Sequence, residues 1–202
     1  MISKLRFGIL SYHGDVIEHK NALIAAATEL NLEIEVVEVR STLDLSKLSA
    51  LIIPGGESNI MYKLANRYEI FEKLKQIPCI FGTCAGAIML SKEIEGAEEG
   101  QKSLSLLDIK SKRNAYGRQS ESFEALIHTS LGDVTALFIR APVIEVTSKK
   151  THIMATFDSK IVAVEQETFS SYFLATTFHP ELNTTLFHKH FIKKVLEKVQ
   201  KV

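Results

Sequence analysis

The sequence predicts one α/β domain whose mostly parallel sheet is covered by helices on both faces. In the first half of the chain, short apolar runs ending at glycine or proline alternate with helical patterns, which is typical of parallel sheets. In the second half, apolar runs follow one another with short turns between them, which indicates antiparallel strands added to that sheet. The 202 residues suffice for one well-buried domain, and they contain no repeat, low-complexity segment or linker. We therefore expect residues 1–202 to form a single domain.

The first half of the chain supplies the expected parallel strands, each a short apolar run or an alternation of apolar and charged residues. These strands are residues 5–10, 33–39, 50–53 and 77–81. Helices are expected at residues 18–30, from about 59 to 64 or beyond, and at 85–90. The first helix has the clearest pattern, because Leu23, Ala27 and Leu30 fall on one face.

The second half of the chain is richer in strands. We expect them at residues 104–109, 122–128, 134–139, 153–157, 161–166 and 172–178. A last helix is expected at 185–199, where apolar residues recur at helical spacing and form an inward stripe. This stripe consists of Leu186, Phe187, Phe191, Val195 and Val199.

Composition narrows the possible classes of function. Lysine and arginine together number 24, as do aspartate and glutamate, so the chain lacks the basic excess that nucleic-acid phosphates call for. No apolar run approaches the roughly 20 residues that span a bilayer, and residues 1–10 have the pattern of a core strand rather than of a signal peptide. Cys79 and Cys84 match neither a disulfide framework nor a zinc pattern, so we expect a reducing, cytoplasmic setting.

Three polar segments follow apolar strands: residues 54–57, 82–84 and 178–181. In an open parallel sheet, functional sites gather at the carboxyl ends of the strands, so these segments are expected to meet. Gly82-Thr83-Cys84-Ala85-Gly86 has the spacing of a nucleophile elbow, in which a tight strand-to-helix turn presents the reactive side chain. A cysteine at a helix N-terminus is stabilised as the nucleophilic thiolate. The alternative is a small buried cysteine that precedes a helix.

His179 and Glu181 could activate that cysteine. A histidine at a strand end can take the thiol proton and later protonate a departing amine. A carboxylate beside it holds the imidazole in the required tautomer and stabilises its charged form. Pro180 between them restricts the local backbone. Taken alone, His-Pro-Glu is more often an ordinary loop, but with Cys84 it predicts a catalytic triad.

Gly55 and Gly56 follow a buried strand and form either a plain turn or a site for developing negative charge. Attack on an amide carbonyl makes an oxyanion, which fixed backbone N–H groups stabilise. The N–H groups of Gly56 and Ala85 are the expected pair, because the nucleophile and this turn follow adjacent strands. Glycine suits the first position, since its backbone can turn a donor toward a ligand without steric cost.

These motifs resemble those of the class I, triad-type glutamine amidotransferases. The resemblance lies in residues 54–58, 81–86 and 179–181, and the stretches 113–119, 122–123 and 138–142 narrow it further. Those stretches are similar to the glutaminase subunits of pyridoxal 5′-phosphate synthases that work without deoxyxylulose 5-phosphate. The likeness runs from Leu5 to the final helix. It implies a three-layer, flavodoxin-like fold with a mixed, mostly parallel sheet and helices on both faces.

The resemblance also implies a role for individual residues. Cys84 would be the nucleophile, with His179 and Glu181 completing the triad. The glutamine pocket would be lined by Gly55, Gly56, Glu57, Arg113, and the backbone of Ile139 and Arg140. Physical chemistry agrees, because an arginine suits the α-carboxylate of glutamine and an acidic side chain suits its α-ammonium group. The alternative for Arg113 and Arg140 is an ion pair at the surface or at the edge of the core.

The implied reaction is hydrolysis of L-glutamine to L-glutamate and ammonia, with no metal or cofactor bound by this chain. The ammonia would pass to a synthase subunit, a barrel enzyme that forms large rings carrying one glutaminase per synthase subunit. Two alternatives remain: a glutaminase of another pathway, such as purine or histidine synthesis, and a non-catalytic sensor whose Cys84 is merely reactive. One position departs from the family pattern, since His13 stands where glutamine is usual. The other histidines are expected at the surface or at helix caps.

Overall fold

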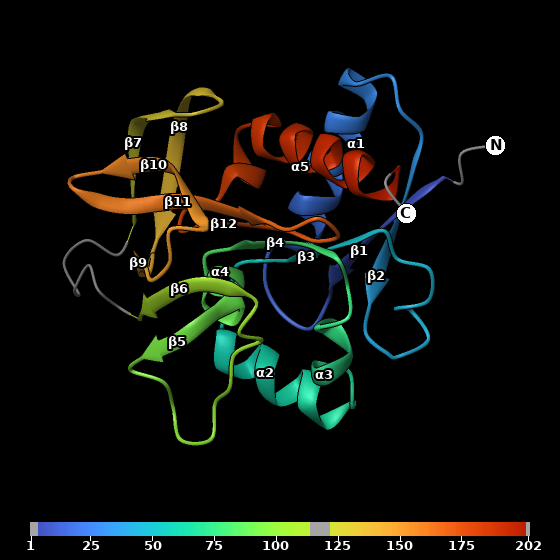
Figure 1. Cartoon of the computed structure of the whole chain (residues 1–202), viewed down its shortest axis with the longest axis horizontal. Helices are drawn as coiled ribbons and strands as arrows, with labels where there is room; N and C mark the ends of the chain where they lie inside the picture. Colours follow the sequence, from blue (N-terminus) through green and yellow to red (C-terminus); the bar gives the residue numbers. More distant parts are fainter. Residues whose placement is uncertain (1–3, 114–121, 201–202) are drawn as a thin grey trace.

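The computed structural model describes residues 4–113 and 122–200, in which one mixed sheet passes between two layers of helices (Figure 1). Its parallel part has the strand order β2-β1-β3-β4-β12. These strands are β1 (Leu5–Leu10), β2 (Ile34–Val39), β3 (Ala50–Ile53), β4 (Cys79–Thr83) and β12 (Tyr172–Thr176). From β1 the chain turns to one side to form β2 and then to the other side to form β3. This reversal is the topological switch point at which open α/β sheets bind ligands.

Antiparallel strands extend the sheet beyond β12. They follow in the order β11, β10, β7 and β8, and a branch leads from β11 through β9 and β6 to β5. Their bounds are β5 (Ser91–Glu95), β6 (Leu107–Lys112), β7 (Ser122–Thr129), β8 (Gly132–Ile139), β9 (Val143–Val146), β10 (Thr151–Phe157) and β11 (Lys160–Glu167). The sequence patterns missed β5 and β9. The first has three charged residues among five, the second has only four residues, and the strand expected at 104–109 begins three residues later.

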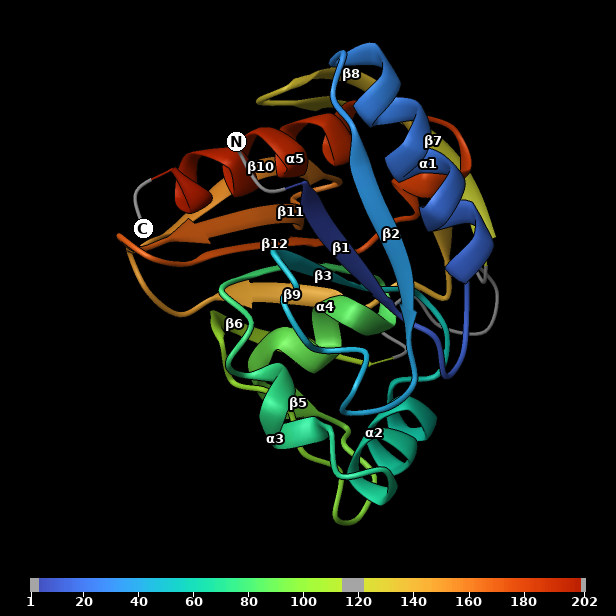
Figure 2. The same ribbon diagram turned by 90° about the vertical axis from the view of Figure 1, so that its right-hand side faces the viewer.

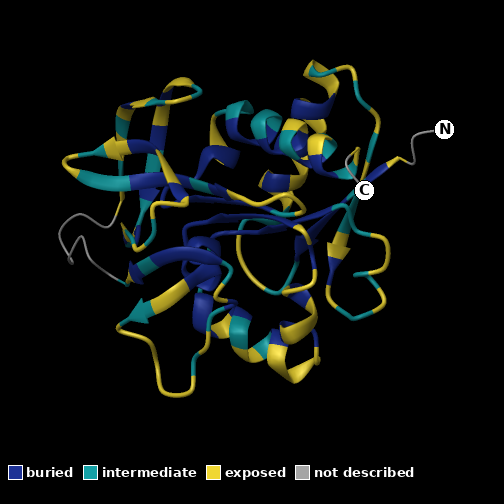
Figure 3. Ribbon diagram, in the orientation of Figure 1, coloured by how far each residue is buried: buried dark blue, intermediate teal, exposed yellow. Residues whose placement is uncertain are grey.

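Helices cover both faces of the sheet, as expected. On one face lie α1 (Val16–Glu29) and α5 (Leu186–Val199); on the other lie α2 (Ser58–Arg67), α3 (Phe71–Leu74) and α4 (Ala85–Leu90) (Figure 2). Alternate strand residues point to opposite faces, so Ile52 packs in the core beneath α1 and α5, whereas Leu51 and Ile53 pack beneath α2 and α4. Figure 3 shows the central strands buried and the outer helix faces exposed. Among the described residues, no helix combines the length and apolar character needed to cross a membrane.

Candidate active site

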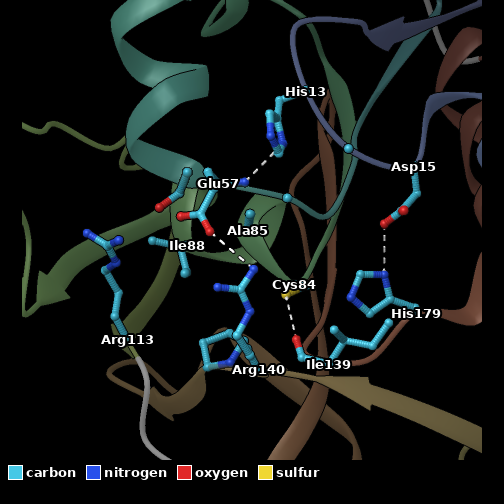
Figure 4. Close-up of a pocket in the computed structure, with 14 residues that line it drawn as sticks. His13, Asp15, Glu57, Cys84, Ala85, Ile88, Arg113, Ile139, Arg140 and His179 are labelled. Atoms are coloured by element: carbon cyan, nitrogen blue, oxygen red, sulfur yellow. Dashed lines mark hydrogen bonds and ion pairs between the residues drawn. The ribbon is translucent and has the colours of Figure 1, made fainter. Parts of the chain in front are cut away.

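Four segments meet at the carboxyl edge of the parallel strands and enclose a cavity of about 220 Å³ (Figure 4). They follow β1, β3, β4 and β12, and the end of β8 closes the cavity from the side. The lining residues are His13, Gly14, Asp15, Gly56, Glu57, Ser58, Cys84, Ala85, Ile88, Arg113, Ile139, Arg140, Pro142 and His179. Of the predicted site residues, Gly55 and Glu181 are absent from this lining.

Cys84 occupies a strained turn between β4 and α4. Its backbone angles are φ 48° and ψ −102°, a conformation that costs a non-glycine residue free energy and is found mainly at functional sites. The glycines of the motif make this turn possible: a Cβ atom on Gly82 would clash with Gly86, and one on Gly86 would clash with the carbonyl group of Ile53. The Cys84 Sγ atom lies 3.7 Å from the carbonyl oxygen of Ile139. Its thiol therefore faces the cavity, as a nucleophile elbow requires.

His179 lies after β12, the strand that pairs with β4, and its ring is buried beside two carboxylates. Its Nδ1 atom is 2.8 Å from Glu181 Oε1 and 3.1 Å from Asp15 Oδ2. Burial alone would lower the pKa of His179, but its interactions with Asp15, Cys84 and Glu181 raise it to about 12. The two carboxylates therefore favour the imidazolium form of the ring. Its Nε2 atom is buried without a hydrogen-bond partner among the described residues, and this is the atom available to the cavity.

The two carboxylates beside His179 differ in their surroundings. The Glu181 side chain is fully buried on a short 3-10 turn, Pro180–Leu182, and burial raises the pKa of its carboxyl group. The Asp15 side chain is 33% exposed at the start of α1, and its hydrogen bond with His179 lowers the pKa of its carboxyl group. Sequence reasoning missed Asp15. Its signal was its place directly after the His13-Gly14 turn, at the end of a parallel strand.

The turn after β3 contacts both His179 and His13. A Cβ atom on Gly55 would clash with the His179 ring, so glycine is required for the ring to lie against this turn. Gly56 has φ +132°, a conformation that side chains rarely adopt. The N–H of Glu57 donates to His13 Nδ1 across 3.3 Å. Gly56 and Ala85, whose N–H groups are the predicted oxyanion donors, both line the cavity.

The charged side chains expected to hold glutamine lie at the outer part of the cavity. Arg113 is 15% exposed and donates to the side-chain oxygen of Gln101 across 3.1 Å, with Glu98 3.7 Å away. Arg140 has its guanidinium 3.2 Å from the carboxylate of Glu57. Both arginines therefore form polar contacts on the protein and line the cavity as well. Residues 114–119 of the stretch that begins at Arg113 lie outside the described residues.

Two histidines contradict the expectation of surface or capping roles. His19 on α1 and His188 on α5 are completely buried between the helices and the sheet. Sequence reasoning missed their burial, because a histidine within the apolar stripe of a helix is taken for a polar residue on the exposed face. Among the described residues, Asp15, His179 and Glu181 are also the one group whose ligand atoms lie close enough, within 4.8 Å, to hold a metal ion. Hydrogen bonds to His179 already account for that grouping.

Comparison with known proteins agrees with this geometry. Residues 9–197 match the model of the SNO glutamine amidotransferase family. The pyridoxal 5′-phosphate synthase subunit PdxT of Pyrococcus horikoshii is 41% identical, over 95% of this chain and 100% of that protein. PdxT of Pyrobaculum arsenaticum is 43% identical, over 92% of this chain and 95% of that protein.

Solved structures also resemble this chain. A crystal structure of a glutamine amidotransferase has a TM-score of 0.81 at 39% identity and covers 94% of this chain and 98% of its own. The structure of PurLQS from Thermotoga maritima, with a TM-score of 0.55 at 18% identity, shows a likeness of fold alone. The family match spans nearly all of the described residues, and the relatives are covered over almost their whole length. The chain therefore belongs to the SNO glutamine amidotransferase family.

Proposed function

We propose that this chain is the glutaminase of a pyridoxal 5′-phosphate synthase and that Cys84, His179 and Glu181 carry out its chemistry. The observation that carries the proposal is the strained Cys84 directly after β4, together with His179 directly after β12, the parallel neighbour of β4. That histidine is held on one nitrogen by carboxylates and leaves the other to the cavity. Residues 1–202 would act as one amidotransferase domain in the reducing cytoplasm, where a catalytic thiol survives.

The reaction begins with attack of the Cys84 thiolate on the side-chain carboxamide carbon of glutamine. A C–S bond forms, and the carbonyl oxygen becomes an oxyanion that the N–H groups of Gly56 and Ala85 accommodate. The His179 imidazolium then gives its Nε2 proton to the nitrogen of the carboxamide, the C–N bond breaks and ammonia leaves. A thioester and a neutral imidazole remain.

Water completes the cycle. His179 takes a proton from a water molecule, the resulting hydroxide attacks the thioester carbon, and the C–S bond breaks to release glutamate. The imidazolium and the thiolate are restored. Glu181 and Asp15 stabilise the charged ring at both ends of this cycle, since both carboxylates lie beside its Nδ1 atom.

The outer cavity suits the α-amino acid end of glutamine. The guanidinium of Arg113 would hold the α-carboxylate, and the carboxylate of Glu57 would hold the α-ammonium group, with Gly55 and Gly56 and the Ile139–Arg140 backbone shaping the remaining wall. Gly55 does not line the cavity, but its lack of a side chain allows the His179 ring to pack against this turn. The carboxylate of Glu57, which pairs with Arg140 in the structure, would exchange that contact for the substrate ammonium group.

The ammonia would pass to a separate synthase subunit. The relatives at about 40% identity are named as subunits of pyridoxal 5′-phosphate synthase, which supports a partner of that kind for this chain. We expect a hetero-oligomer in which a ring of synthase subunits carries one glutaminase each. His13 replaces the usual glutamine beside the turn after β3, and its contact with the Glu57 N–H preserves a polar link there.

Glutamate release by wild type, Cys84→Ala and Cys79→Ala, each with and without the synthase, tests the proposal. Cys79 is the matched control, because it is the other free cysteine, is buried at the start of β4, the strand that precedes Cys84, and lies outside the cavity lining. We expect weak activity that rises with the synthase in wild type and Cys79→Ala, and none in Cys84→Ala. A glutamine-mimicking electrophile should label Cys84 alone. Activity that survives in Cys84→Ala would refute the mechanism, and full activity unaffected by the synthase would refute the subunit role.

A further inference from the structure

Two buried histidines form a polar chain behind the triad. His19 Nδ1 lies 3.0 Å from His188 Nε2, which joins α1 to α5. The other ring nitrogen of His19, Nε2, lies 3.0 Å from Thr83 Oγ1 and 3.5 Å from Glu181 Oε1. His19 therefore touches both the residue that precedes the nucleophile and the triad carboxylate. Neither histidine lines the substrate cavity.

The positions of the ring protons follow from burial. Burial lowers the pKa of His19 well below its ordinary value and lowers that of His188 to about 3, so both rings are neutral and carry one N–H each. His188 Nδ1 has no hydrogen-bond partner among the described residues. A proton there would leave a buried N–H unsatisfied, which costs free energy, so the proton of His188 belongs on Nε2.

That placement determines the tautomer of His19. Since His188 donates from Nε2, His19 Nδ1 must accept, and the single proton of His19 lies on Nε2. There it points at Thr83 Oγ1 and Glu181 Oε1. In the opposite arrangement, the bare Nε2 lone pair of His19 would face the carboxylate. In the favoured arrangement, His188 donates to His19, and His19 in turn donates toward Thr83 and the carboxylate of Glu181.

We propose that His19 and His188 are positioning residues that keep Glu181 ionised and aimed at His179. The proposal rests on the function proposed above. Glu181 is buried, which favours its neutral form, and its Oε2 atom has no hydrogen-bond partner among the described residues. Its Oε1 atom therefore depends on N–H donors, and among the described residues the side chains of His179 and His19 lie within 2.8 Å and 3.5 Å of it. Without His19, Glu181 protonates more readily and the imidazolium of His179 loses stabilisation.

The surroundings of His19 keep its ring in place. The ring of Phe81 on β4 meets His19 edge-on at a centroid distance of 6.2 Å and meets His188 at 5.4 Å. The titratable groups that face His19 are His188 on α5 and Glu181 and His179 beside the 3-10 turn. A histidine retained only for packing would be replaceable by an apolar side chain of similar size. The donor role predicts that it is not.

The test compares His19→Met, which removes the donor, with His19→Gln, whose amide can place an N–H near the position of Nε2. We expect His19→Met in the complex with the synthase to lower kcat for glutamine hydrolysis about ten- to a hundredfold with KM within about twofold of wild type. His19→Gln should recover a large part of kcat, and His188→Leu should lower kcat by a smaller factor. His128→Gln, a change at an exposed histidine on β7, is the control and should leave kcat unchanged.

Two readouts separate this proposal from the proposed function and from a folding defect. The pH dependence of Cys84 alkylation by iodoacetamide needs no glutamine, and its midpoint should move to higher pH in His19→Met and return toward wild type in His19→Gln. Nitrogen-15 NMR of the wild-type imidazoles needs no variant and should show both His19 and His188 neutral with the proton on Nε2. A proton on Nδ1 of either ring, an unshifted alkylation profile, or equal kcat in His19→Met and His19→Gln would overturn the proposal.

Discussion

Two carboxylates share one nitrogen of His179, and their burial predicts very different effects when each is neutralised. Glu181→Gln leaves the imidazolium without its fully buried counter-charge. Breaking a buried pair costs about 3–5 kcal/mol. We expect this cost to fall on the charged ring that protonates the leaving ammonia; at about 1.36 kcal/mol per factor of ten, kcat should then fall roughly two hundred- to five thousandfold. Asp15 is one-third exposed, so solvent screens its charge, and Asp15→Asn should cost about 1 kcal/mol, or roughly fivefold in kcat.

The assay is steady-state glutamine hydrolysis in the complex with the synthase, accompanied by an NMR titration of His179. Both substitutions should lower the pKa of His179, with the larger change in Glu181→Gln. Asp133→Asn, a neutralised carboxylate beside the exposed His128, is a matched control that should leave kcat unchanged. If Asp15→Asn lowered kcat as much as Glu181→Gln, Asp15 rather than Glu181 would be the third member of the triad, and the assignment would be refuted.

Three further predictions follow from the same geometry. The pKa of His179 is raised from 6.5 to about 12, so this residue stabilises the fold fully below pH 6.5 and loses that effect as the pH rises toward 12. The urea-unfolding free energy should therefore decline over this range, and His179→Asn should flatten the decline; an equal decline in both proteins would contradict the charge assignment. Gly86→Ala places a Cβ atom on the carbonyl oxygen of Ile53 and should cost about 1–3 kcal/mol in the same urea experiment, whereas an unchanged midpoint would show that β3 and α4 are not in such close contact. Arg113→Gln should raise KM for glutamine roughly tenfold or more with little change in kcat, because a charge-assisted hydrogen bond to the α-carboxylate is lost, while Arg67→Gln on the exposed side of α2 should leave KM unchanged.

The meeting of Cys84 with His179 could be predicted from the sequence, because both follow apolar runs and parallel strands end at the same edge. The family prediction was confirmed by the match over residues 9–197. The end of each apolar run indicates where the strand ends and a polar side chain can reach the site. The two short glycine-containing motifs indicate that the backbone can turn tightly there. These local signals suffice when the fold brings strand ends together.

Asp15 and the buried histidines could not be predicted in the same way. Asp15 precedes a helix, where an aspartate is ordinarily a cap, but its side chain makes no capping hydrogen bond and turns to His179 instead. His19 and His188 come from helices at opposite ends of the chain, and their contact depends on how α1 packs against α5. No local pattern carries that information, since the two residues gain their partners only in the tertiary structure.

The pairing of β4 with β12 places a constraint on how this protein is made. Thr83 lies opposite Thr176, and the antiparallel strands lie between the two in the sequence. The strand that precedes Cys84 therefore cannot pair with β12 until those antiparallel strands have been synthesised. Contacts between such distant segments form late in folding, because closing a long loop is entropically costly. On the ribosome, a nascent chain would therefore hold Cys84 for some time without a base beside it. Under the proposed mechanism, glutamine hydrolysis requires β12 and the turn that follows it, so the site cannot assemble before these segments have been synthesised.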